Sequence, residues 1–276
     1  MSGSTTSIGI IAGGGDLPLE VARACTEAGH TVALFAIDEF AADIPASVDH
    51  ARGIISKLGP GIRFLKSRHC TDVVFVGNFA RPRDRNIRVR PDLTAILFLI
   101  RNFGVLRRSN DGIHRAFANE FERWGFRIIS PLTAAPGLAA DAGYLTDTRP
   151  TPEIEQQYAA AVAAARAHGM TGEGQAIVFG DGQVLAREAR AGTDAMLRDL
   201  PPQPTRRAFL VKSMSPGQLP TMDPPAIGMD TVRLVAERGL AGIVVEAKKS
   251  IIVHPARVKE VADKEGLFVC GIQVEP

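Results

Sequence analysis

The sequence predicts an α/β protein built from two domains. Its 276 residues exceed what one small module needs and suit either one large α/β domain or two domains of ordinary size. Short apolar runs alternate with helical patterns, which is typical of mostly parallel sheets covered by helices on both faces. Residues 134–143 are small and include no aromatic or β-branched side chain, as is common in linkers. We therefore expect an N-terminal domain over residues 1–135 and a C-terminal domain over residues 136–276, joined by a short linker.

The N-terminal half is expected to be Rossmann-like, with a mostly parallel sheet. An apolar run near its start is followed by three glycines and then by a helical pattern, which is how an α/β unit begins. Later apolar runs are rich in valine, leucine and phenylalanine, and indicate further buried strands. The expected strands cover residues 8–12, 31–37, 72–76 and 126–129. One expected helix ends at residue 28, and three others cover residues 61–68, 92–103 and 111–124.

The C-terminal half predicts a mixed sheet with helices. Gly180-Asp181-Gly182 lies between two short strand patterns, and an Asp-Gly pair at such a place indicates a tight hairpin. We also expect the strand over residues 250–253 to be a hairpin partner of the strand before it. The expected strands cover residues 175–179, 183–187, 208–212, 242–246, 250–253 and 267–272, and the expected helices cover residues 152–168, 229–238 and 255–264.

Composition and charge exclude several classes of protein. Apolar residues make up 45% of the chain and charged residues 22%, which is a globular composition. The 32 basic and 30 acidic residues leave a net charge of +2, so we expect no nucleic-acid partner. Three scattered cysteines indicate neither a metal site nor a disulfide framework, and no apolar run approaches the ~20 residues that span a bilayer. Because the first residues also lack a signal-peptide pattern, the chain is expected to be cytoplasmic.

A glycine triplet, Gly13-Gly14-Gly15, follows the first expected strand. It departs from the dinucleotide-binding fingerprint because Pro18 replaces the third glycine. A glycine turn before a helix N-terminus still offers backbone N–H groups to an anion, so the triplet is a candidate phosphate contact. The alternative is a tight turn that needs glycine only for its backbone conformation.

Asn78 and Arg81 follow the strongest expected strand, at the strand end where parallel sheets bind ligands. Both side chains suit a phosphate and are candidate substrate contacts, whereas the alternative is an exposed turn.

Nine arginines but only three acidic residues lie between Arg81 and Arg115. Within that stretch, residues 93–100 are apolar nearly all round. Such a helix is normally part of a core, but beside arginines it could also hold an acyl chain or rest on an anionic membrane.

The C-terminal half supplies further candidates. Thr193 and Asp194 precede an expected helix, where either could instead be an N-cap, and Lys212 places a charge at a strand end. Asp223 lies among prolines in a loop that starts at Gln218. Such a rigid loop can hold a carboxylate in place as a metal ligand or a general base, so Asp223 is a candidate for either role. The alternative is that Asp223 only forms an Asx turn. The chain lacks the familiar hydrolase signatures and any histidine cluster. A metal would therefore have oxygen ligands, as Mg²⁺ usually does, with Mn²⁺ as its substitute.

Several segments together resemble the LpxI class of UDP-2,3-diacylglucosamine pyrophosphatases. Each segment is weak alone, but they occur in order over nearly the whole chain. They are IIAGGGDLP (10–18), VGNFARP (76–82), FERWGF (121–126), GQ (174–175), GTDAML (192–197), DPPAIG (223–228) and LAGI (240–243). The resemblance implies two α/β domains and an enzyme of lipid A biosynthesis in Gram-negative bacteria. Its reaction would cleave UDP-2,3-diacylglucosamine into UMP and 2,3-diacylglucosamine 1-phosphate, with Mg²⁺ assisting.

The resemblance also assigns residues. It makes Asp223 the essential carboxylate, as metal ligand or base, and we take Asp194 as the next candidate for catalysis. Gln175, Thr193 and Gln218 join Lys212 as candidate substrate contacts. Where the family commonly has an arginine, two residues before the essential carboxylate, this chain has threonine.

The sequence also suggests partners and leaves two other functional classes as alternatives. A lipid substrate implies peripheral contact with the inner face of the inner membrane, and a second copy of the chain is a candidate partner. One rival is a nucleotide-dependent oxidoreductase based on the Rossmann-like half. The other is a non-catalytic protein that binds a UDP-sugar or a lipid.

Overall fold

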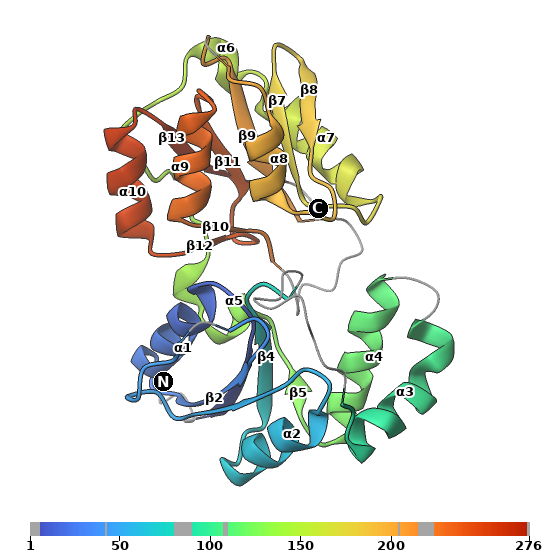
Figure 1. Cartoon of the computed structure of the whole chain (residues 1–276). Helices are drawn as coiled ribbons and strands as arrows, with labels where there is room; N and C mark the ends of the chain where they lie inside the picture. The colour runs from blue at the N-terminus through green and yellow to red at the C-terminus, as the bar shows by residue number, and fades with distance from the viewer. Residues whose placement is uncertain are drawn as a thin grey trace. The chain divides into compact units, whose positions relative to one another are not determined.

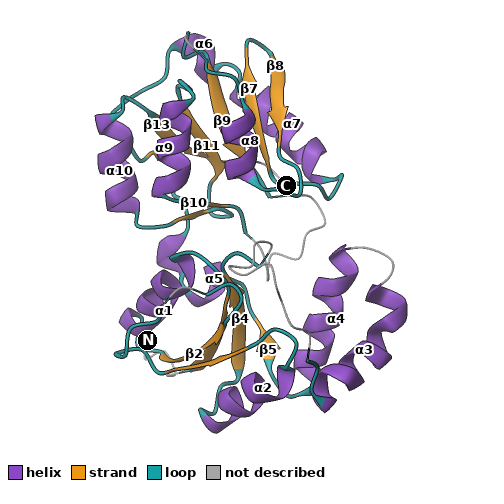
Figure 2. Cartoon of the chain, in the orientation of Figure 1, coloured by secondary structure: helices purple, strands orange, loops and turns teal. Residues whose placement is uncertain are grey.

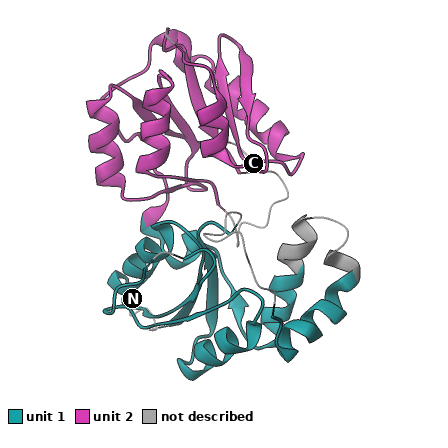
Figure 3. Ribbon diagram, in the orientation of Figure 1, with its two compact units in different colours: residues 1–137, 219–223 teal, residues 138–218, 224–276 magenta. Residues whose placement is uncertain are grey.

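The computed structural model describes residues 6–41, 43–79, 90–106, 110–203, 205–214 and 224–274, with the backbone alone for residues 104–106 and 110–115. These residues form two compact units, one ending at Gly137 and the other beginning at Leu138 (Figure 3). Each unit consists of a sheet with helices packed on it (Figure 2). The predicted α/β class with two domains is confirmed.

The first unit contains the first five strands of the chain (Figure 1). Its elements, in order, are β1 (Ser7–Ala12), α1 (Leu17–Glu27), β2 (Thr31–Ile37), β3 (His50–Gly53), α2 (Leu58–Ser67), β4 (Asp72–Val76), α3 (Leu93–Leu106), α4 (Asn110–Arg123), β5 (Arg127–Ile128) and α5 (Pro131–Ala134), followed by a 3-10 helix (Pro136–Leu138).

The strand order of this sheet is β3-β2-β1-β4-β5, and all neighbouring strands are parallel. This is the order of a Rossmann-like sheet, and its direction of winding reverses between β1 and β4. The Rossmann-like prediction is therefore confirmed. The sequence pattern does not predict β3, because its four residues, HARG, contain no apolar run and lie partly exposed at the sheet edge.

The three cysteines are free and buried. The Cys25 thiol donates to the carbonyl of Ala134 at 3.3 Å and so connects α1 to α5. Burial raises the pKa of Cys25 to about 11, and it has the same effect on Cys270 in the second unit. Neither thiol is therefore a ready nucleophile near neutral pH.

The second unit contains the remaining strands. Its elements are β6 (Gly143–Tyr144), α6 (Pro152–Glu155), α7 (Tyr158–Gly169), β7 (Ala176–Gly180), β8 (Gln183–Arg187), α8 (Thr193–Asp199), β9 (Ala208–Lys212), β10 (Ala226–Ile227), α9 (Met229–Glu237), β11 (Gly242–Glu246), β12 (Ile251–Ile252), α10 (Pro255–Lys264) and β13 (Phe268–Ile272).

The main sheet of this unit has the order β6-β13-β11-β9-β7-β8. Strands β13, β11 and β9 are parallel to one another, whereas β6, β7 and β8 pair antiparallel with their neighbours. The predicted mixed sheet is confirmed. The hairpin between β7 and β8 turns at Asp181 and Gly182, whose φ angles of 49° and 76° fit the predicted tight turn.

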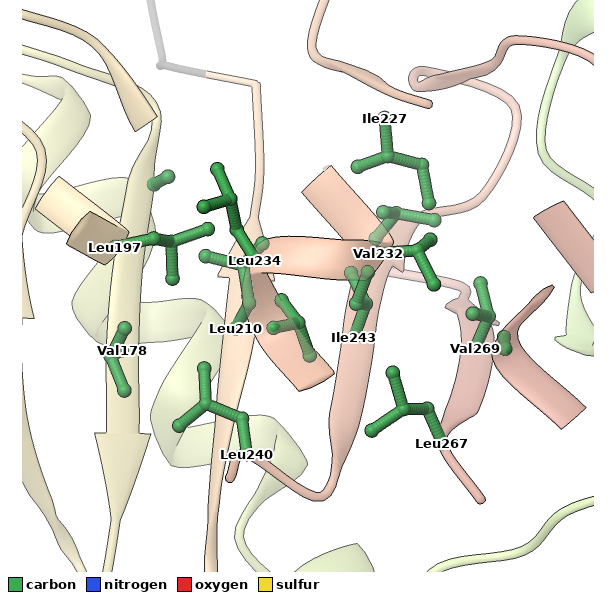
Figure 4. Close-up of a cluster of buried hydrophobic side chains, with 14 of the residues drawn as sticks. Val178, Leu197, Leu210, Ile227, Val232, Leu234, Leu240, Ile243, Leu267 and Val269 are labelled. Atoms are coloured by element: carbon green, nitrogen blue, oxygen red, sulfur yellow. The ribbon is translucent and has the colours of Figure 1, made fainter. Parts of the chain in front are cut away.

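The core of the second unit lies on both faces of this sheet. Successive residues of a strand point to opposite faces, so Leu210 of β9 joins one cluster and Phe209 joins the other. Helices α8, α9 and α10 cover the face of Leu210, where Leu197 and Val232 pack against the strands (Figure 4). Helices α6 and α7 cover the opposite face.

Two local predictions in this unit were wrong. The strand at Ile251–Ile252 does not form a hairpin with β11, because β9 and β13 already occupy both edges of β11; it pairs in parallel with β10 instead. The helix expected over residues 152–168 is two helices, and the break lies at Gln156 and Gln157. The Gln157 side chain accepts a hydrogen bond from the N–H of Gly182 at 2.8 Å, a tertiary contact that the local sequence does not indicate.

The small-residue segment over residues 134–143 joins the two units, but it is packed. Ala134, Ala135 and Leu138 are buried. Ala140 donates to the carbonyl of Ser250 at 2.8 Å, and Gly143 pairs with Gly271 at the sheet edge. The lack of large side chains here allows close backbone contact.

Candidate functional site

In the first unit, the loops after β1 and β4 meet where the sheet reverses its winding. The N–H of Gly13 donates to the carbonyl of Val76 at 2.9 Å, and Gly14 and Asn78 exchange two backbone hydrogen bonds of 2.9 and 2.8 Å. The N–H groups of Gly13 and Gly14 are therefore used within the protein, and the expectation that they are free for an anion was wrong. Asn78 is exposed at this point.

Glycine is needed here because backbone packs directly on backbone. A Cβ atom on Gly13 would lie 2.9 Å from the Asn78 carbonyl oxygen. A Cβ atom on Gly77, whose φ is +103°, would lie 2.8 Å from the Gly14 carbonyl oxygen. Gly15 has a φ of +86°, but a Cβ atom there would meet nothing within 4 Å. The tight-turn alternative thus explains Gly13, and Gly15 keeps the open surroundings that a ligand contact requires.

We expect Gly77→Ala to destabilise the first unit more than Gly125→Ala does. Both glycines have φ values that disfavour a side chain, +103° and +91°, but nothing lies within 4 Å of a Cβ on Gly125. The difference between the variants therefore isolates the clash with the loop after β1, which should cost an additional ~1–3 kcal/mol of unfolding free energy. Urea unfolding followed by fluorescence of Trp124, the chain's one tryptophan, checks this. Equal losses would mean that the two loops separate easily.

In the second unit, Glu188 brings two predicted residues together. Its carboxylate accepts hydrogen bonds from the backbone N–H of Gln175 at 2.7 Å and from the Thr193 hydroxyl at 2.9 Å. The buried His168 ring donates to the Glu188 carbonyl at 2.7 Å. A Cβ atom on Gly174 would lie 2.6 Å from the Glu188 side chain, so the Gly-Gln pair is what lets this carboxylate approach.

Thr193 and Asp194 do not cap α8. The N-cap residue is Gly192, and the Thr193 hydroxyl is turned to Glu188 instead. Asp194 lies in the first turn, where an acid suits the helix dipole, and its carboxylate is 4.0 Å from the guanidinium of Arg198. The N-cap alternative was therefore wrong for both residues.

A buried carboxylate, Glu246, ends strand β11. With 1% of its surface exposed, it accepts hydrogen bonds from Arg166 at 2.9 Å and Lys249 at 2.6 Å through one oxygen. Its other oxygen accepts from the Ser213 hydroxyl at 2.8 Å and the Met214 N–H at 3.2 Å. Burial alone would raise the pKa of Glu246, but the hydrogen bonds from these side chains outweigh it and lower the pKa. The group is therefore an ionised carboxylate at neutral pH.

Lys212 lies at the same end of the sheet. It pairs in register with Ala176 of β7, directly after Gln175, and the N–H of Ser213 donates to the Gln175 carbonyl at 3.1 Å. The Lys212 ammonium donates to the carbonyl of Ala226 at 3.0 Å. Because an ammonium group has three donors, this contact leaves capacity for a ligand.

Two sequence candidates, Gln218 and Asp223, lie outside the described residues, as does Arg81 of the first unit. The described residues that flank 215–223 are held firmly. Met214 is bound to Glu246, and beyond the segment Pro225 accepts a hydrogen bond from the N–H of Ile251 at 2.8 Å. Glu246 and Lys212 thus hold the chain on either side of the segment that carries Asp223.

The described residues do not make a metal site by themselves. Among them, no group of three or more histidine, cysteine, aspartate or glutamate side chains is arranged to hold a metal ion. The carboxylates of Glu188 and Glu246 are already occupied by protein donors. The magnesium site expected from the sequence, with Asp223 and phosphate oxygens as ligands, stays a prediction.

Comparison with known protein families covers both units. The model of the LpxI N-terminal domain matches residues 7–138, and that of the LpxI C-terminal domain matches residues 141–270. The chain belongs to the LpxI family. A relative from Caulobacter vibrioides, named UDP-2,3-diacylglucosamine pyrophosphatase LpxI, is 36% identical over 276 residues, covering 96% of this chain and 97% of its own. A solved structure of a putative NAD-dependent epimerase/dehydratase from Methylobacillus flagellatus is 15% identical and covers 51% of this chain and 41% of its own, with a TM-score of 0.26. This last similarity is too low to carry an argument.

In this LpxI-family chain, the structure brings Gln175, Thr193 and Lys212 to one end of the second sheet, and Asn78 to the glycine triplet of the first. Glu188 and Glu246 were not among the residues predicted from the sequence. Both could have been noticed, since each is an acid directly after or at the end of a strand pattern. Their partners could not, because they come from other elements.

Proposed function

We propose that this chain hydrolyses the pyrophosphate of UDP-2,3-diacylglucosamine, releasing UMP and 2,3-diacylglucosamine 1-phosphate. The observation that carries the proposal is the 36% identity to the Caulobacter pyrophosphatase over nearly the full length of both chains. Both LpxI domain models match as well, so neither half of the family architecture is missing.

The chemistry of the described residues supports the same reaction class. Hydrolysis of a phosphoanhydride needs neutralisation of charge on the phosphate and a positioned water molecule. Lys212 and Asn78 supply donors that suit phosphate oxygens, and Gln175 lies beside Lys212. We propose that the catalytic carboxylate is Asp223, with Asp194 as the second candidate, and that Arg81, Gln218, Thr193 and Gly15 contribute to substrate binding.

Mass-detected cleavage of UDP-2,3-diacylglucosamine tests this function. The expected products are UMP and 2,3-diacylglucosamine 1-phosphate in equal amounts. Tight binding of the substrate without turnover would favour the non-catalytic binding protein instead. A thermal shift with NAD(H) or NADP(H) and none with the UDP-lipid would favour the oxidoreductase. The sequence argues against that class, because the dinucleotide-binding fingerprint lacks its third glycine.

We expect chelation to abolish activity. If Asp223 and the substrate phosphates share Mg²⁺, or Mn²⁺ in its place, exhaustive EDTA treatment should reduce turnover at least ~100-fold. Added Mg²⁺ in excess over EDTA should restore it, and EDTA presaturated with Mg²⁺ is the matched control. Full activity after exhaustive chelation would contradict the metal requirement.

We propose that the protein acts in the cytoplasm and contacts the inner face of the inner membrane peripherally, where a diacylated substrate resides. A homodimer also stays a proposal, and sedimentation velocity over a range of concentrations tests it. No nucleic-acid partner is expected from the near balance of charge.

A further inference from the structure

Exposed apolar side chains are concentrated on helix α3. Nine large hydrophobic residues of the described chain are exposed, and six of them belong to this one helix. They are Leu93 (72% exposed), Ile96 (40%), Leu97 (40%), Leu99 (47%), Ile100 (67%) and Phe103 (61%). Isolated exposed hydrophobic residues are ordinary, but a contiguous set marks an interaction surface. We call these six residues the α3 face.

The α3 face is opposite to the side of the helix that packs on the protein. At 3.6 residues per turn, the six side chains fall within an arc of about 160°. The buried residues Ala95 and Phe98 lie outside this arc, and the Phe98 ring packs against Phe117 of α4 with centroids 4.7 Å apart. Figure 1 shows α3 on the outer side of α4, away from the sheet. Helix α3 is therefore anchored by one side and leaves the other uncovered within the first unit.

The charges of α3 and of the residues that follow it in the sequence are basic. No acidic residue occurs between Leu93 and Asn110 in the sequence, whereas Arg101, Arg107 and Arg108 do. Asp92, just before the helix, is occupied, because its two carboxylate oxygens accept hydrogen bonds from the N–H groups of Gly59 and Ala95, both at 2.8 Å. Arg101 pairs with the buried Glu120, which is also 3.6 Å from Arg123, so these two arginines share one acid.

We propose that the α3 face docks on an anionic lipid bilayer. An amphipathic helix in an interface buries its apolar arc among the acyl chains, and its basic flanks attract acidic headgroups. A second copy of the chain is a poorer occupant, because symmetric contact would place two basic segments against each other. The helix lies on the bilayer and does not cross it: within the described residues, no helix is long and apolar enough to span a membrane.

Co-sedimentation with vesicles, without any substrate, tests the proposal separately from the proposed reaction. The probe is phosphatidylcholine vesicles with and without phosphatidylglycerol. We expect binding to the anionic vesicles that weakens with salt, and at least a ~10-fold loss of partitioning in the triple variant Leu93→Gln, Ile100→Gln, Phe103→Gln. The matched control replaces the three exposed hydrophobic residues outside α3, Ile55, Met170 and Leu185, by glutamine and should bind as wild type does.

Three results would overturn the proposal. The first is equal vesicle binding by the two triple variants. The second is a concentration-dependent dimer that only the α3 variant abolishes, which would assign the face to a second copy. The third is loss of turnover of micellar substrate by the α3 variant with vesicle binding intact, which would assign the face to the acyl chains of the substrate. Failure of the reaction itself, with vesicle binding as expected, would leave the membrane surface standing and remove only the proposed function.

Discussion

Replacing Asp223 by alanine is expected to slow cleavage of UDP-2,3-diacylglucosamine at least ~100-fold while leaving folding and substrate binding nearly unchanged. Asp223 lies outside the described residues, but the chain that follows it is anchored: Pro224 and Pro225 are buried, and Pro225 accepts a hydrogen bond from Ile251. A carboxylate held beside a phosphoanhydride acts mainly in the transition state, as a base or as a metal ligand. Its loss therefore lowers kcat much more than it lowers substrate affinity. The measurement is kcat together with substrate affinity.

Two further variants make this result specific. Asp223→Asn keeps the size of the side chain and removes its charge, so it should be impaired as severely as the alanine variant. Asp199→Ala removes an exposed acid from α8 and is expected to retain wild-type turnover. Turnover of Asp223→Ala within a few-fold of wild type would place the catalytic carboxylate elsewhere, and Asp194→Ala would be the next variant to assay.

Glu246→Ala is expected to destabilise the second unit by ~3–5 kcal/mol, because it leaves the guanidinium of Arg166 without its buried anion and removes the acceptor of three further donors. Both tyrosines of the chain, Tyr144 and Tyr158, belong to this unit, so urea unfolding followed by tyrosine absorbance reports on it. The matched control is Asp230→Ala, which breaks an exposed ion pair with Arg233 in the same unit and should change stability little.

The pH dependence of Glu246 gives a second measurement. Its pKa in the folded protein is lower than the ordinary 4.5, so the folded state binds its proton more weakly than the unfolded state does. Its stabilising contribution is therefore complete above pH ~4.5 and is lost as pH falls through the lower, folded-state value. The stability difference between wild type and Glu246→Gln should shrink on acidification below pH 4.5. A difference that does not change with pH would mean that packing, and not charge, makes Glu246 important.

Sequence patterns predicted much of the fold correctly. The expected strands over 31–37, 72–76, 208–212 and 242–246 coincide with β2, β4, β9 and β11. These strands lie inside their sheets and are mostly buried on both faces, so each is a continuous apolar run whose ends are marked by polar residues. Strand β3, at a sheet edge with a polar sequence, carries no such pattern and was missed.

The candidate residues were predicted singly, but their contacts were not. The sequence indicates that Gln175, Thr193 and Lys212 occur near strand or helix ends, and the order of seven short segments indicates the LpxI family. It does not indicate that Glu188 joins Gln175 to Thr193, or that Thr193 prefers that carboxylate to capping its own helix. A side chain with two possible hydrogen-bond partners binds the one that the fold brings close to it.

By itself, the sequence determined the α/β class, the positions of the buried strands, the parallel character of the first sheet and the family. These depend on local periodicity and on short motifs, which stay readable without knowledge of distant partners. Only the tertiary structure decided that β12 pairs with β10, that the amides of Gly13 and Gly14 are used within the protein, and that Glu246 binds Ser213, 33 positions earlier. The physical reason is that hydrogen bonds at strand ends form between segments brought together by the sheet, and a buried donor or acceptor takes whichever partner that arrangement supplies.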